Sequence, residues 1–558
     1  MLKKTFLAIA IAAAAITLFS AAFNVIGAAS SPGAALTGEV SSPEEGRMEG
    51  VLVSAKRDGS TVTITVVSDA KGRYRFPSSK LEPGRYSLRI RAVGYELESS
   101  QPAEVTAQKT TQLDLKLRKA QDLASQLSNG EWLISMPGTD EQKQGFLSCV
   151  SCHTVERIAR SRYNADELVQ VLKRMRTYAQ GSTPLRPQVR PGVRDPSPAQ
   201  QQQMTKFAQY LSTINLSKVA KWEYPLKTLP RPKGKATRVI ITEYDLPRPE
   251  AMPHDAAVDA EGMVWYSDFG SQYLGKLDPK TAKAVEYPVP VTKPGAPAGA
   301  LDLGFDPEGN VWLGMMYQGS IAKFDRKTQK FQTWSAPKFM ENNEARLAMV
   351  DPRHLNLDGK VWIGGDDEYR LDLKTGEWYT VDYSRGLPKD GPPADRLGSY
   401  GVISDSKNNF YGTNFSGQYI IKIDAKTLNV TPFPTPTPNS APRRGHMDPQ
   451  DRLWFAEYRG NMIGMFDTKT ERTREWAVPT AWTNPYDAIL DKNGYAWTGG
   501  MTIDYVVRLN TKTDEDIEYL LPRTTNIRRV NVDNSTNPPT FWVGNNHGAA
   551  IIKIEPLE

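Results

Sequence analysis

The chain of 558 residues has only two cysteines and five histidines, and its net charge is small. Two cysteines exclude a disulfide framework, so the fold must be stabilised by packed cores. Lys and Arg number 69 against 63 Asp and Glu, with both signs interspersed, so the composition favours neither nucleic acid nor a polyanionic partner. Glycine and proline, by contrast, number 42 and 40, and their turns leave room for few long helices. The length and composition therefore indicate a largely β protein of three or more domains.

Both cysteines lie in one motif, Cys149-Val150-Ser151-Cys152-His153, which is the C-x-x-C-H signature of covalent c-type haem attachment. Two thiols at this spacing can form thioether bonds to the two vinyl groups of one haem, with His153 as the proximal iron ligand. The alternatives are a thioredoxin-like redox motif, half of a zinc site, or a chance spacing. The redox motif would not need the histidine, and zinc would need four ligands, whereas the nearest other histidine is His254. The sequence predicts a covalently bound haem c.

The amino terminus has the pattern of a secretory signal peptide over residues 1–29. Two lysines precede an apolar run over residues 6–26, and small residues follow at 27–29. An uncleaved membrane anchor is the alternative, because the run is long enough to span a bilayer. Either segment places the rest of the chain outside the cytoplasm, where haem c is attached. We therefore expect a periplasmic or secreted protein, with no stable membrane span after cleavage.

Residues 33–119 alternate with the two-residue period of β-strands, most clearly over 60–67 and 86–93. The phrases Gly72-Arg-Tyr-Arg-Phe76 and Pro83-Gly-Arg-Tyr86, followed by Gly94-Tyr95, resemble the carboxypeptidase regulatory-like domain, a transthyretin-like β-sandwich with a carbohydrate-binding-like fold. The resemblance implies an accessory or binding module. The segment contains no histidine or cysteine, so we expect no chemistry there.

Residues 128–217 have a helical pattern, with helices expected over 141–146, 165–180 and 198–214. Three helices around a haem are the plan of a small cytochrome c domain, which this segment resembles in size and pattern. Met175 is the predicted sixth iron ligand, and Met204 or an open position is the alternative. Either methionine could instead be an ordinary core residue. A thioether ligand raises the haem potential and therefore predicts electron transfer.

Residues 235–558 contain an internal repeat. An aromatic residue closes a short strand at intervals of 43 to 50 residues, and phrases such as Gly275-Lys-Leu-Asp-Pro-Lys-Thr281 follow it. The seven aromatic positions are Trp265, Trp312, Trp362, Tyr411, Trp454, Trp497 and Trp542. The seventh copy lacks an outer strand, which residues 239–247 would supply to close the ring. The predicted fold class is mainly β and multidomain: a transthyretin-like β-sandwich, a small helical cytochrome c domain and a seven-bladed β-propeller.

The propeller segment resembles the virginiamycin B lyase (streptogramin lyase) family in phrases such as Asp306-Pro-Glu-Gly-Asn-Val-Trp312 and Trp454-Phe-Ala-Glu457. The resemblance implies a carbon–oxygen lyase that opens a cyclic ester by elimination, using histidine, glutamate and Mg²⁺ at the mouth of the channel. This chain departs from that pattern. Tyr458-Arg459 follows Glu457 where a nearby histidine would be wanted, and His547 follows an asparagine rather than a glutamate.

Polar residues next to the expected inner strands should converge at one channel mouth. The predicted catalytic residues among them are His254, His354, Glu457 and His547. The other members of the set are Asp255, Asp268, Asp302, Arg353, Tyr400, Asn414, Arg443, Arg444, Asp487, Arg528, Arg529 and Asn545. Histidine with carboxylate can hold a divalent metal or transfer protons, and clustered arginine favours an anionic ligand. Each is equally compatible with a solvated structural role in a wet channel.

Three functions remain open from the sequence. The first, which we favour, is electron transfer through the haem, coupled to a substrate or partner bound on the propeller. The second is a lyase reaction at the channel mouth, and the third is a binding or sensing scaffold without catalysis. We expect an electron-transfer partner and a small-molecule substrate, and no nucleic acid.

Overall fold

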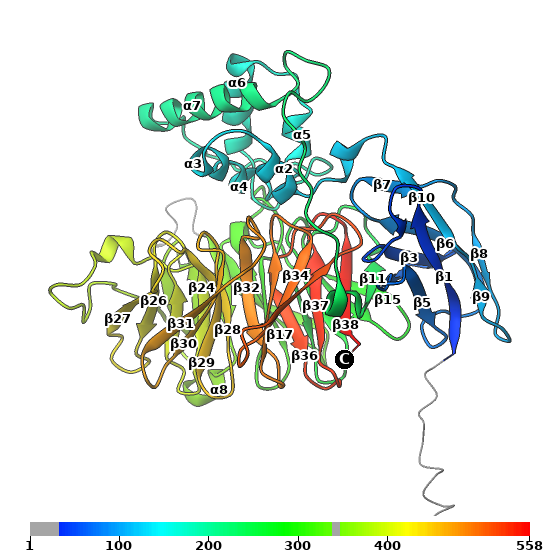
Figure 1. Cartoon of the computed structure of the whole chain (residues 1–558). Coiled ribbons are helices and arrows are strands. Elements are labelled where there is room, and N and C mark those ends of the chain that lie inside the picture. The colour runs from blue at the N-terminus through cyan, green and yellow to red at the C-terminus, as the bar shows by residue number, and fades with distance from the viewer. Residues whose placement is uncertain (1–32, 338–345, 558) are drawn as a thin grey trace, which may run out of the picture.

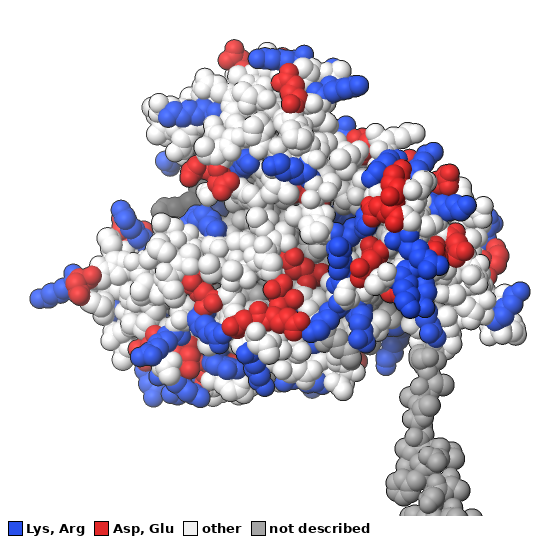
Figure 2. All heavy atoms as spheres, in the orientation of Figure 1, with Lys and Arg blue, Asp and Glu red and all other residues white. Residues whose placement is uncertain are grey.

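The structure is a computed structural model, and it describes residues 33–337 and 346–557 (Figure 1). The predicted signal peptide, residues 1–29, lies outside these ranges. The described chain is mainly β and has three parts: a β-sandwich, a group of short helices and a ring of sheets. No helix within the described ranges is long and apolar enough to cross a bilayer. On the face drawn in Figure 2, basic and acidic side chains are interspersed, in keeping with the small net charge.

The first part is the β-sandwich that the alternating pattern predicts. Two of its strands, β4 and β6, fall on the two most regular segments of the sequence. Alternate residues of β6, Tyr86 and Leu88, are buried in the sandwich core together with Tyr74 and Phe76 of β5. The strands are β1 (Ala34–Ser42), β2 (Gly46–Arg47), β3 (Leu52–Arg57), β4 (Val62–Val67), β5 (Arg73–Pro77), β6 (Gly84–Arg91), β7 (Tyr95–Leu97), β8 (Ala103–Val105), β9 (Thr111–Gln112) and β10 (Leu115–Lys119).

The second part, the helical layer, covers residues 123–214. Its helices are η2 (Leu123–Gln126), α2 (Asn129–Ser135), α3 (Asp140–Gln144), α4 (Phe146–Cys149), α5 (Glu156–Ala159), α6 (Ala165–Arg176) and α7 (Pro198–Ile214). The expected helix at 198–214 is confirmed: Ser197 caps the backbone N–H of Gln200, and proline occupies the first turn. The helix expected at 165–180 ends at Arg176, because the chain turns back and Tyr178 pairs with Val189.

The third part is a ring of antiparallel sheets. In the described residues six of these sheets have four strands each, and strands β36, β37, β38 and β11 continue the series. The inner strands are β12 (Pro253–Val258), β16 (Asp302–Phe305), β20 (Leu347–Asp351), β24 (Gly401–Ser404), β28 (Pro442–Met447), β32 (Pro485–Leu490) and β36 (Val530–Asp533). Each inner strand contacts the inner strand of the next sheet, and β36 contacts β12. The sheets therefore surround a central channel, as in a β-propeller.

The remaining strands of the ring lie progressively farther from the channel. The second strands are β13 (Val264–Asp268), β17 (Val311–Met315), β21 (Lys360–Gly365), β25 (Phe410–Thr413), β29 (Arg452–Glu457), β33 (Tyr495–Gly500) and β37 (Thr540–Asn545). The third strands are β14 (Tyr273–Asp278), β18 (Ser320–Asp325), β22 (Glu368–Asp372), β26 (Tyr419–Ile423), β30 (Met462–Asp467), β34 (Tyr505–Asn510) and β38 (Ala550–Pro556). The outer strands are β15 (Lys283–Pro288), β19 (Lys330–Ser335), β23 (Trp378–Thr380), β27 (Val430–Pro434), β31 (Arg472–Ala477), β35 (Asp516–Leu520) and β11 (Val239–Asp245).

The repeated Asp-x-x-Gly-x-x-Trp phrase forms the turn between an inner and a second strand. The Asp306 carboxylate accepts hydrogen bonds from the backbone of Asn310 at 2.8 Å and from Nε1 of Trp312 at 3.0 Å. The same aspartate-to-indole bond joins Asp259 to Trp265, Asp448 to Trp454 and Asp491 to Trp497. Because the carboxylate ties the turn to a buried ring, these residue types recur at the same place in the repeat.

Strand β11 completes the last sheet of the ring, as the sequence predicts, by pairing antiparallel with β38 along its whole length. Its other edge pairs with β4 of the sandwich, which the sequence did not predict. One continuous sheet of eight strands, in the order β36-β37-β38-β11-β4-β3-β6-β8, therefore joins the two parts. Both faces of β4 are covered, since Ile64 lies in the sandwich core and Val67 in a core shared with the ring. An ion pair between Arg91 and Asp504, at 2.5 Å and almost fully buried, adds to this junction.

The helical layer lies over one end of the ring, which we call the mouth (Figure 1). Two glycines allow the close approach. The backbone N–H of Gly130 donates to the carbonyl of Thr502 at 2.6 Å, and a Cβ at Gly130 would collide with Ile503. A Cβ at Gly181 would collide with the carbonyl of Phe269. The helical layer is thus packed directly against the mouth.

Candidate functional site

The Cys149-to-His153 motif continues helix α4 by one turn. The backbone N–H groups of Cys152 and His153 both donate to the carbonyl of Cys149, at 3.2 and 3.4 Å. Residues three and four positions apart in such a turn lie on the same face. The two thiols and the imidazole are therefore presented together, as one macrocycle bonded to both sulfurs would require.

The protonation states of these three side chains also suit haem attachment. Both cysteines are free, and burial raises the pKa of Cys149 to about 11 and raises that of Cys152, so both are protonated at pH 7. Nδ1 of His153 lies 2.9 Å from the carbonyl of Thr154, so the proton sits on Nδ1 and Nε2 is left to bind a metal. Burial lowers the pKa of His153, which keeps the imidazole neutral. The donor set fits haem c.

The two candidate methionines lie on different helices. Met175 is in the last turn of α6 and Met204 is in α7, and both are half-buried. In the described chain neither belongs to the buried cluster around Trp132, Phe146 and Leu211 that joins the helices to the mouth. Both thioethers therefore keep surface on which a ligand could lie, and Met175 stays the predicted sixth ligand.

Residues of the mouth hold the backbone of the motif. Nδ2 of Asn526 donates to the carbonyl of Val150 at 3.1 Å, while Arg528 and His547 both reach the carbonyl of Ser151 at 3.3 Å. Burial, and then the Arg528 guanidinium, lower the pKa of His547 to about 4. The imidazole is therefore neutral at pH 7, and its Nε2–H donates to the motif. His547 thus links the propeller to the predicted haem site.

His254 lies on the second residue of β12 and is fully buried. Its Nδ1 lies 2.6 Å from the carboxylate of Asp255, and its Nε2 lies 3.2 Å from the hydroxyl of Tyr486. Burial, followed by the positive charges of Arg528 and Arg444, lowers the pKa of His254 well below its usual range. The imidazole is therefore neutral and bonded through both nitrogens.

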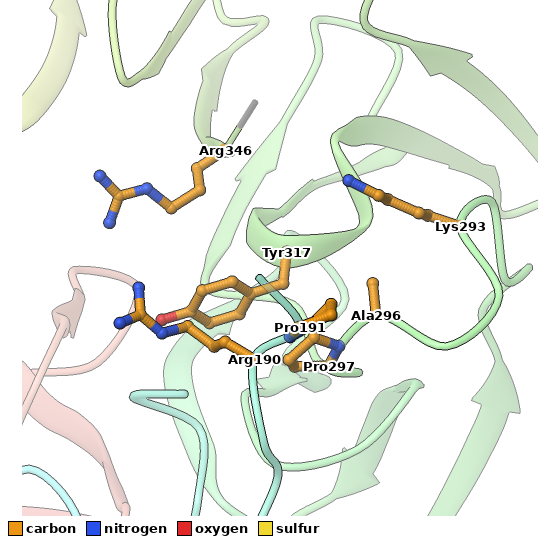
Figure 3. A pocket seen from close by; sticks show the side chains of 7 residues that line it. All are labelled: Arg190, Pro191, Lys293, Ala296, Pro297, Tyr317 and Arg346. Carbon is orange, nitrogen blue, oxygen red and sulfur yellow. The ribbon is translucent and has the colours of Figure 1, made fainter. Parts of the chain in front are cut away.

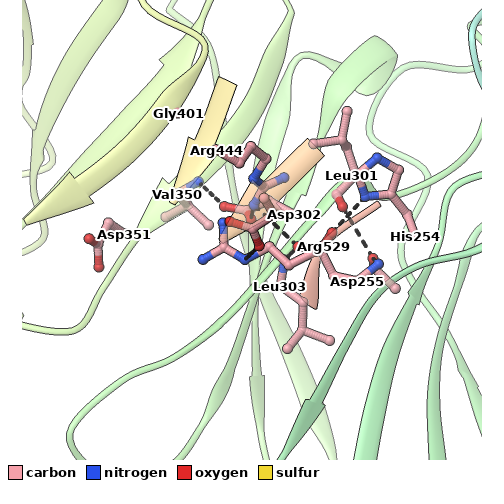
Figure 4. Close-up of polar contacts among 12 residues, drawn as sticks. His254, Asp255, Leu301, Asp302, Leu303, Val350, Asp351, Gly401, Arg444 and Arg529 are labelled. Carbon is pink, nitrogen blue, oxygen red and sulfur yellow. Dashed lines mark hydrogen bonds and ion pairs between the residues drawn. The ribbon is translucent and has the colours of Figure 1, made fainter. Parts of the chain in front are cut away.

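A charged network continues from His254 into the channel (Figure 4). The fully buried Arg444 pairs with Asp302 and lies 3.3 Å from Asp255. Each carboxylate also accepts a backbone N–H from the next inner strand, Leu303 for Asp255 at 3.0 Å and Val350 for Asp302 at 2.9 Å. These aspartates therefore join neighbouring sheets while they neutralise the arginine.

A cavity of about 140 Å³ lies in the channel beyond this network. Its polar lining comes from Asp255, Asp302, Asp351, Arg353, His446, Arg529 and Asn531. His446 pairs with Asp487 at 3.0 Å, so this histidine, like His254, is bonded to a carboxylate. Small polar ligands or water would fit there, but the cavity is too small for a substrate the size of a cyclic peptide.

His354 and Arg353 do not lie at the mouth, so that prediction is wrong. They follow β20, whereas His254 is near the start of β12, so the two histidines are at opposite ends of the inner strands. In this repeat the tight turn is replaced by the short helix α8 (Leu355–Asp358), for which His354 is the residue before the first turn. The extra helical turn shifted the expected start of the inner strand.

Glu457 ends β29, and no histidine is among its partners in the described residues. Its Oε1 is 3.1 Å from the hydroxyl of Ser440. Burial, together with the nearby Glu475, raises the pKa of Glu457 to about 9, so the carboxyl group is neutral at pH 7. Within residues 33–337 and 346–557, no three His, Cys, Asp or Glu side chains are grouped so that they could hold a metal. The Mg²⁺ site that the lyase resemblance implied therefore stays a prediction, with no three-ligand group among the described side chains to assign to it.

Tyr486 is a site residue that the sequence analysis missed, although a signal was present. It is the second residue of β32 in the phrase Pro485-Tyr486-Asp487, which matches Pro253-His254-Asp255 in β12 and Pro442-Arg443-Arg444 in β28. Equivalent positions in different repeats point to the same place in the ring. His254, Arg443 and Tyr486 accordingly converge at the mouth.

A second, smaller pocket lies where the helical layer meets the ring (Figure 3). Arg190 of the layer and Lys293, Tyr317 and Arg346 of the ring line it. In Figure 3 the guanidinium groups of Arg190 and Arg346 lie on the side of the Tyr317 hydroxyl. Burial raises the pKa of Tyr317, and the two arginines oppose that rise. The pocket therefore brings three cationic side chains around one phenol, and one of them, Arg346, is ion-paired with Asp366.

Residues 35–118 match the family model described as a carboxypeptidase regulatory-like domain, so the sandwich is such a domain. No curated protein matches the chain. One similar solved structure is described as a streptogramin B lyase, with 21% identity over 58% of this chain and 100% of that chain and a TM-score of 0.49. Another is a virginiamycin B lyase from Staphylococcus aureus, with 21% identity over 57% of this chain and 99% of that chain and a TM-score of 0.47.

Proposed function

We propose that this is an exported c-type haem protein that exchanges electrons with a substrate or partner at the mouth of a seven-bladed propeller. Cys149 and Cys152 would carry the haem through thioether bonds, and His153 would be its proximal ligand. The observation that carries the proposal is the attachment of this turn to the mouth through Arg528 and His547. Bound there, the iron would supply one-electron transfer.

The chain's own residues would prepare this site in two ways. The Thr154 carbonyl orients the imidazole of His153 and raises its basicity as a ligand. Cys152 is linked to the basic pocket, because its sulfur lies 4.0 Å from the carbonyl of Gln180, whose N–H donates to Tyr317 at 3.2 Å. An anionic group bound near Cys152 would therefore lie close to the basic side chains of this pocket.

The first test is covalent haem. The full chain, exported by a host that attaches haem c, should retain its haem spectrum after denaturation, because thioether bonds survive unfolding. Cys149→Ala and Cys152→Ala should each weaken attachment, and the double variant should abolish it. Ser151→Ala, which changes only a side chain inside the motif, is the matched control and should keep the haem. A wild-type chain without covalent haem would refute the proposal.

The second test is the sixth ligand. Met175→Ala should lower the midpoint potential, because a thioether stabilises reduced iron, whereas Met204→Ala should leave it near the wild-type value. The reverse result would assign Met204. An unchanged potential in both variants would contradict methionine ligation and favour an open axial position.

A lyase reaction is the second candidate, and one observation favours it. The His254–Asp255 pair at the mouth has the composition of a general base with its orienting carboxylate. Ring opening of a cyclic depsipeptide that persists in Cys149→Ala but is lost in His254→Gln would support this reaction. Redox-linked turnover that needs the cysteines would favour electron transfer instead.

A further inference from the structure

A chain of hydrogen bonds crosses the mouth of the ring. The hydroxyls of Tyr400 and Tyr486 are 2.6 Å apart, and Tyr486 lies 3.2 Å from Nε2 of His254. Nδ1 of His254 then lies 2.6 Å from Asp255. Tyr400 directly precedes β24, Tyr486 is in β32 and the other two residues are in β12, so the bonds connect sheets that are not neighbours in the ring.

The two ends of this chain lie in different environments. Asp255 lines the channel cavity of about 140 Å³. Tyr400, which is half-buried, packs against the cluster that contains the helices and the mouth residues Tyr458, Tyr486 and Met501. The side chains between the ends, Tyr486 and His254, are fully buried. The hydrogen bonds therefore connect the helical-layer side of the mouth to the channel through a region closed to bulk water.

The donors and acceptors of the chain can all point the same way. The neutral imidazole of His254 has one N–H, and this proton must be on Nδ1 if it is to donate to the Asp255 carboxylate. Nε2 then accepts the hydroxyl proton of Tyr486, whose oxygen accepts that of Tyr400. We propose that Tyr400, Tyr486, His254 and Asp255 form a proton relay between the helical-layer side of the mouth and the channel cavity.

The transfer balances bond by bond. Tyr400 gives its proton to the oxygen of Tyr486 as the original Tyr486 O–H bond breaks and an Nε2–H bond forms on His254. The Nδ1–H bond of His254 breaks and an O–H bond forms on Asp255. The net result is a phenolate at Tyr400 and a neutral Asp255 carboxyl. A reset requires Asp255 to release its proton to water in the cavity, Tyr400 to take a proton from water on the layer side, and the imidazole of His254 to return to its Nδ1–H tautomer.

Arg443 is placed to stabilise the phenolate. Its guanidinium carbon lies 4.0 Å from the ring centre of Tyr486, 4.4 Å from that of Tyr458 and 5.1 Å from that of Tyr400. Among the described residues no carboxylate lies within ion-pair distance of this buried arginine, and its Nε has no hydrogen-bond partner. A buried cation surrounded by aromatic rings favours negative charge on a neighbouring phenol, here that of Tyr400.

The charges around the relay act in the same direction. Burial alone would raise the pKa of Tyr400, but Arg443 and the hydrogen bond from Tyr486 outweigh burial and lower it. The other charged and titratable groups near the relay are Arg444, Arg528, Tyr458, Asp302 and Asp487. Three arginines thus face the relay from β28 and from the segment before β36, which favours a phenolate at Tyr400 over a protonated His254.

Because the chain contains only five histidines, the relay can be tested by nitrogen NMR of the full-length protein with labelled histidine. Any bound haem is kept in the reduced state. His254 should carry its proton on Nδ1, with an unprotonated Nε2, at pH 7. Alkaline titration should show a tyrosine ionising below pH 10 at 295 nm, with the His254 signals shifting at the same pH. Tyr400→Phe should abolish both changes, and Tyr486→Phe should uncouple the His254 shift from the tyrosine ionisation.

Tyr458→Phe is the matched control, because the ring of Tyr458 contacts Arg443 while its hydroxyl makes no hydrogen bond to any described residue of the relay. It should leave the coupled shift intact. A His254 proton on Nε2, or a coupled shift that survives in Tyr486→Phe, would overturn the relay. If Tyr486→Phe does not fold, Tyr400→Phe decides alone, since loss of both changes supports the relay and their persistence refutes it. The relay does not depend on the haem, so its failure would leave the proposed function standing.

Discussion

Replacing Arg444 with methionine should strongly destabilise the ring, because Arg444 is the buried cation that neutralises Asp255 and Asp302. Removing one member of a buried charge group leaves the others unpaired and costs about 3–5 kcal/mol. The side chain is fully buried, and Asp302 is only 5% exposed, so solvent cannot compensate for the loss. Arg444→Met should therefore lower the free energy of unfolding at pH 7 by an amount in this range.

The loss should depend on pH. Burial raises the pKa of Asp302, and Arg444 opposes that rise. Without Arg444 the native carboxyl would keep a proton that the unfolded chain has released, so the stability of the variant should increase as the pH falls. As the pH falls from 7 to about 4, the ordinary pKa of an unfolded aspartate, the variant's free energy of unfolding should approach that of wild type.

The assay is urea unfolding followed by tryptophan fluorescence at pH 7 and pH 5. Arg452→Met is the matched control: Arg452 pairs with Asp448 at 2.7 Å but is one-third exposed, so its loss should cost less than about 1 kcal/mol. Adding Asp302→Asn to Arg444→Met should restore part of the stability. A loss below about 1 kcal/mol for Arg444→Met, or a loss that does not change with pH, would refute the reasoning.

Three further predictions follow from the contacts described. Glu457→Gln should match wild type in melting temperature near pH 4 and exceed it near pH 8. The reason is that the pKa of Glu457 is raised to about 9 in the folded protein, so the wild-type fold loses stability as the pH rises from 4.5. Parallel pH profiles of the two proteins would contradict this. Gly181→Ala should destabilise the contact between helical layer and mouth by about 1–3 kcal/mol, since its methyl group meets the carbonyl of Phe269, and faster proteolysis of the layer would report it. His354→Ala should leave both the haem spectrum and any activity at the mouth unchanged, and a loss of either would mean that the far end of the channel takes part.

The repeat could be predicted from the sequence because its signal is local. In four of the repeats, those of Trp265, Trp312, Trp454 and Trp497, the indole is hydrogen-bonded to an aspartate six residues earlier, within a single turn. The closing strand β11 could also be predicted, because the last repeat lacks an outer strand. His354 was misplaced for the complementary reason, since one repeat replaces the tight turn by α8.

The candidate site was harder to predict, because it depends on which repeats meet across the ring. Tyr486 and Arg443 share the strand position of His254, but spacing along the chain does not show that their side chains touch. The β4–β11 pairing was missed for a similar reason. Alternating strands have the same pattern whether an edge stays open or finds a partner in another domain.

Strand β11 is the outer strand that closes the ring, and in this protein both of its edges are hydrogen-bonded. A closing strand with one open edge would fray first, and its amide hydrogens would exchange with solvent ahead of the rest of the sheet. Here the sandwich covers that edge, so opening the ring requires two rows of hydrogen bonds to break together. The amides of Ile240, Ile241 and Thr242 should accordingly exchange as slowly as those of a central strand. The small sandwich thereby keeps the much larger ring closed.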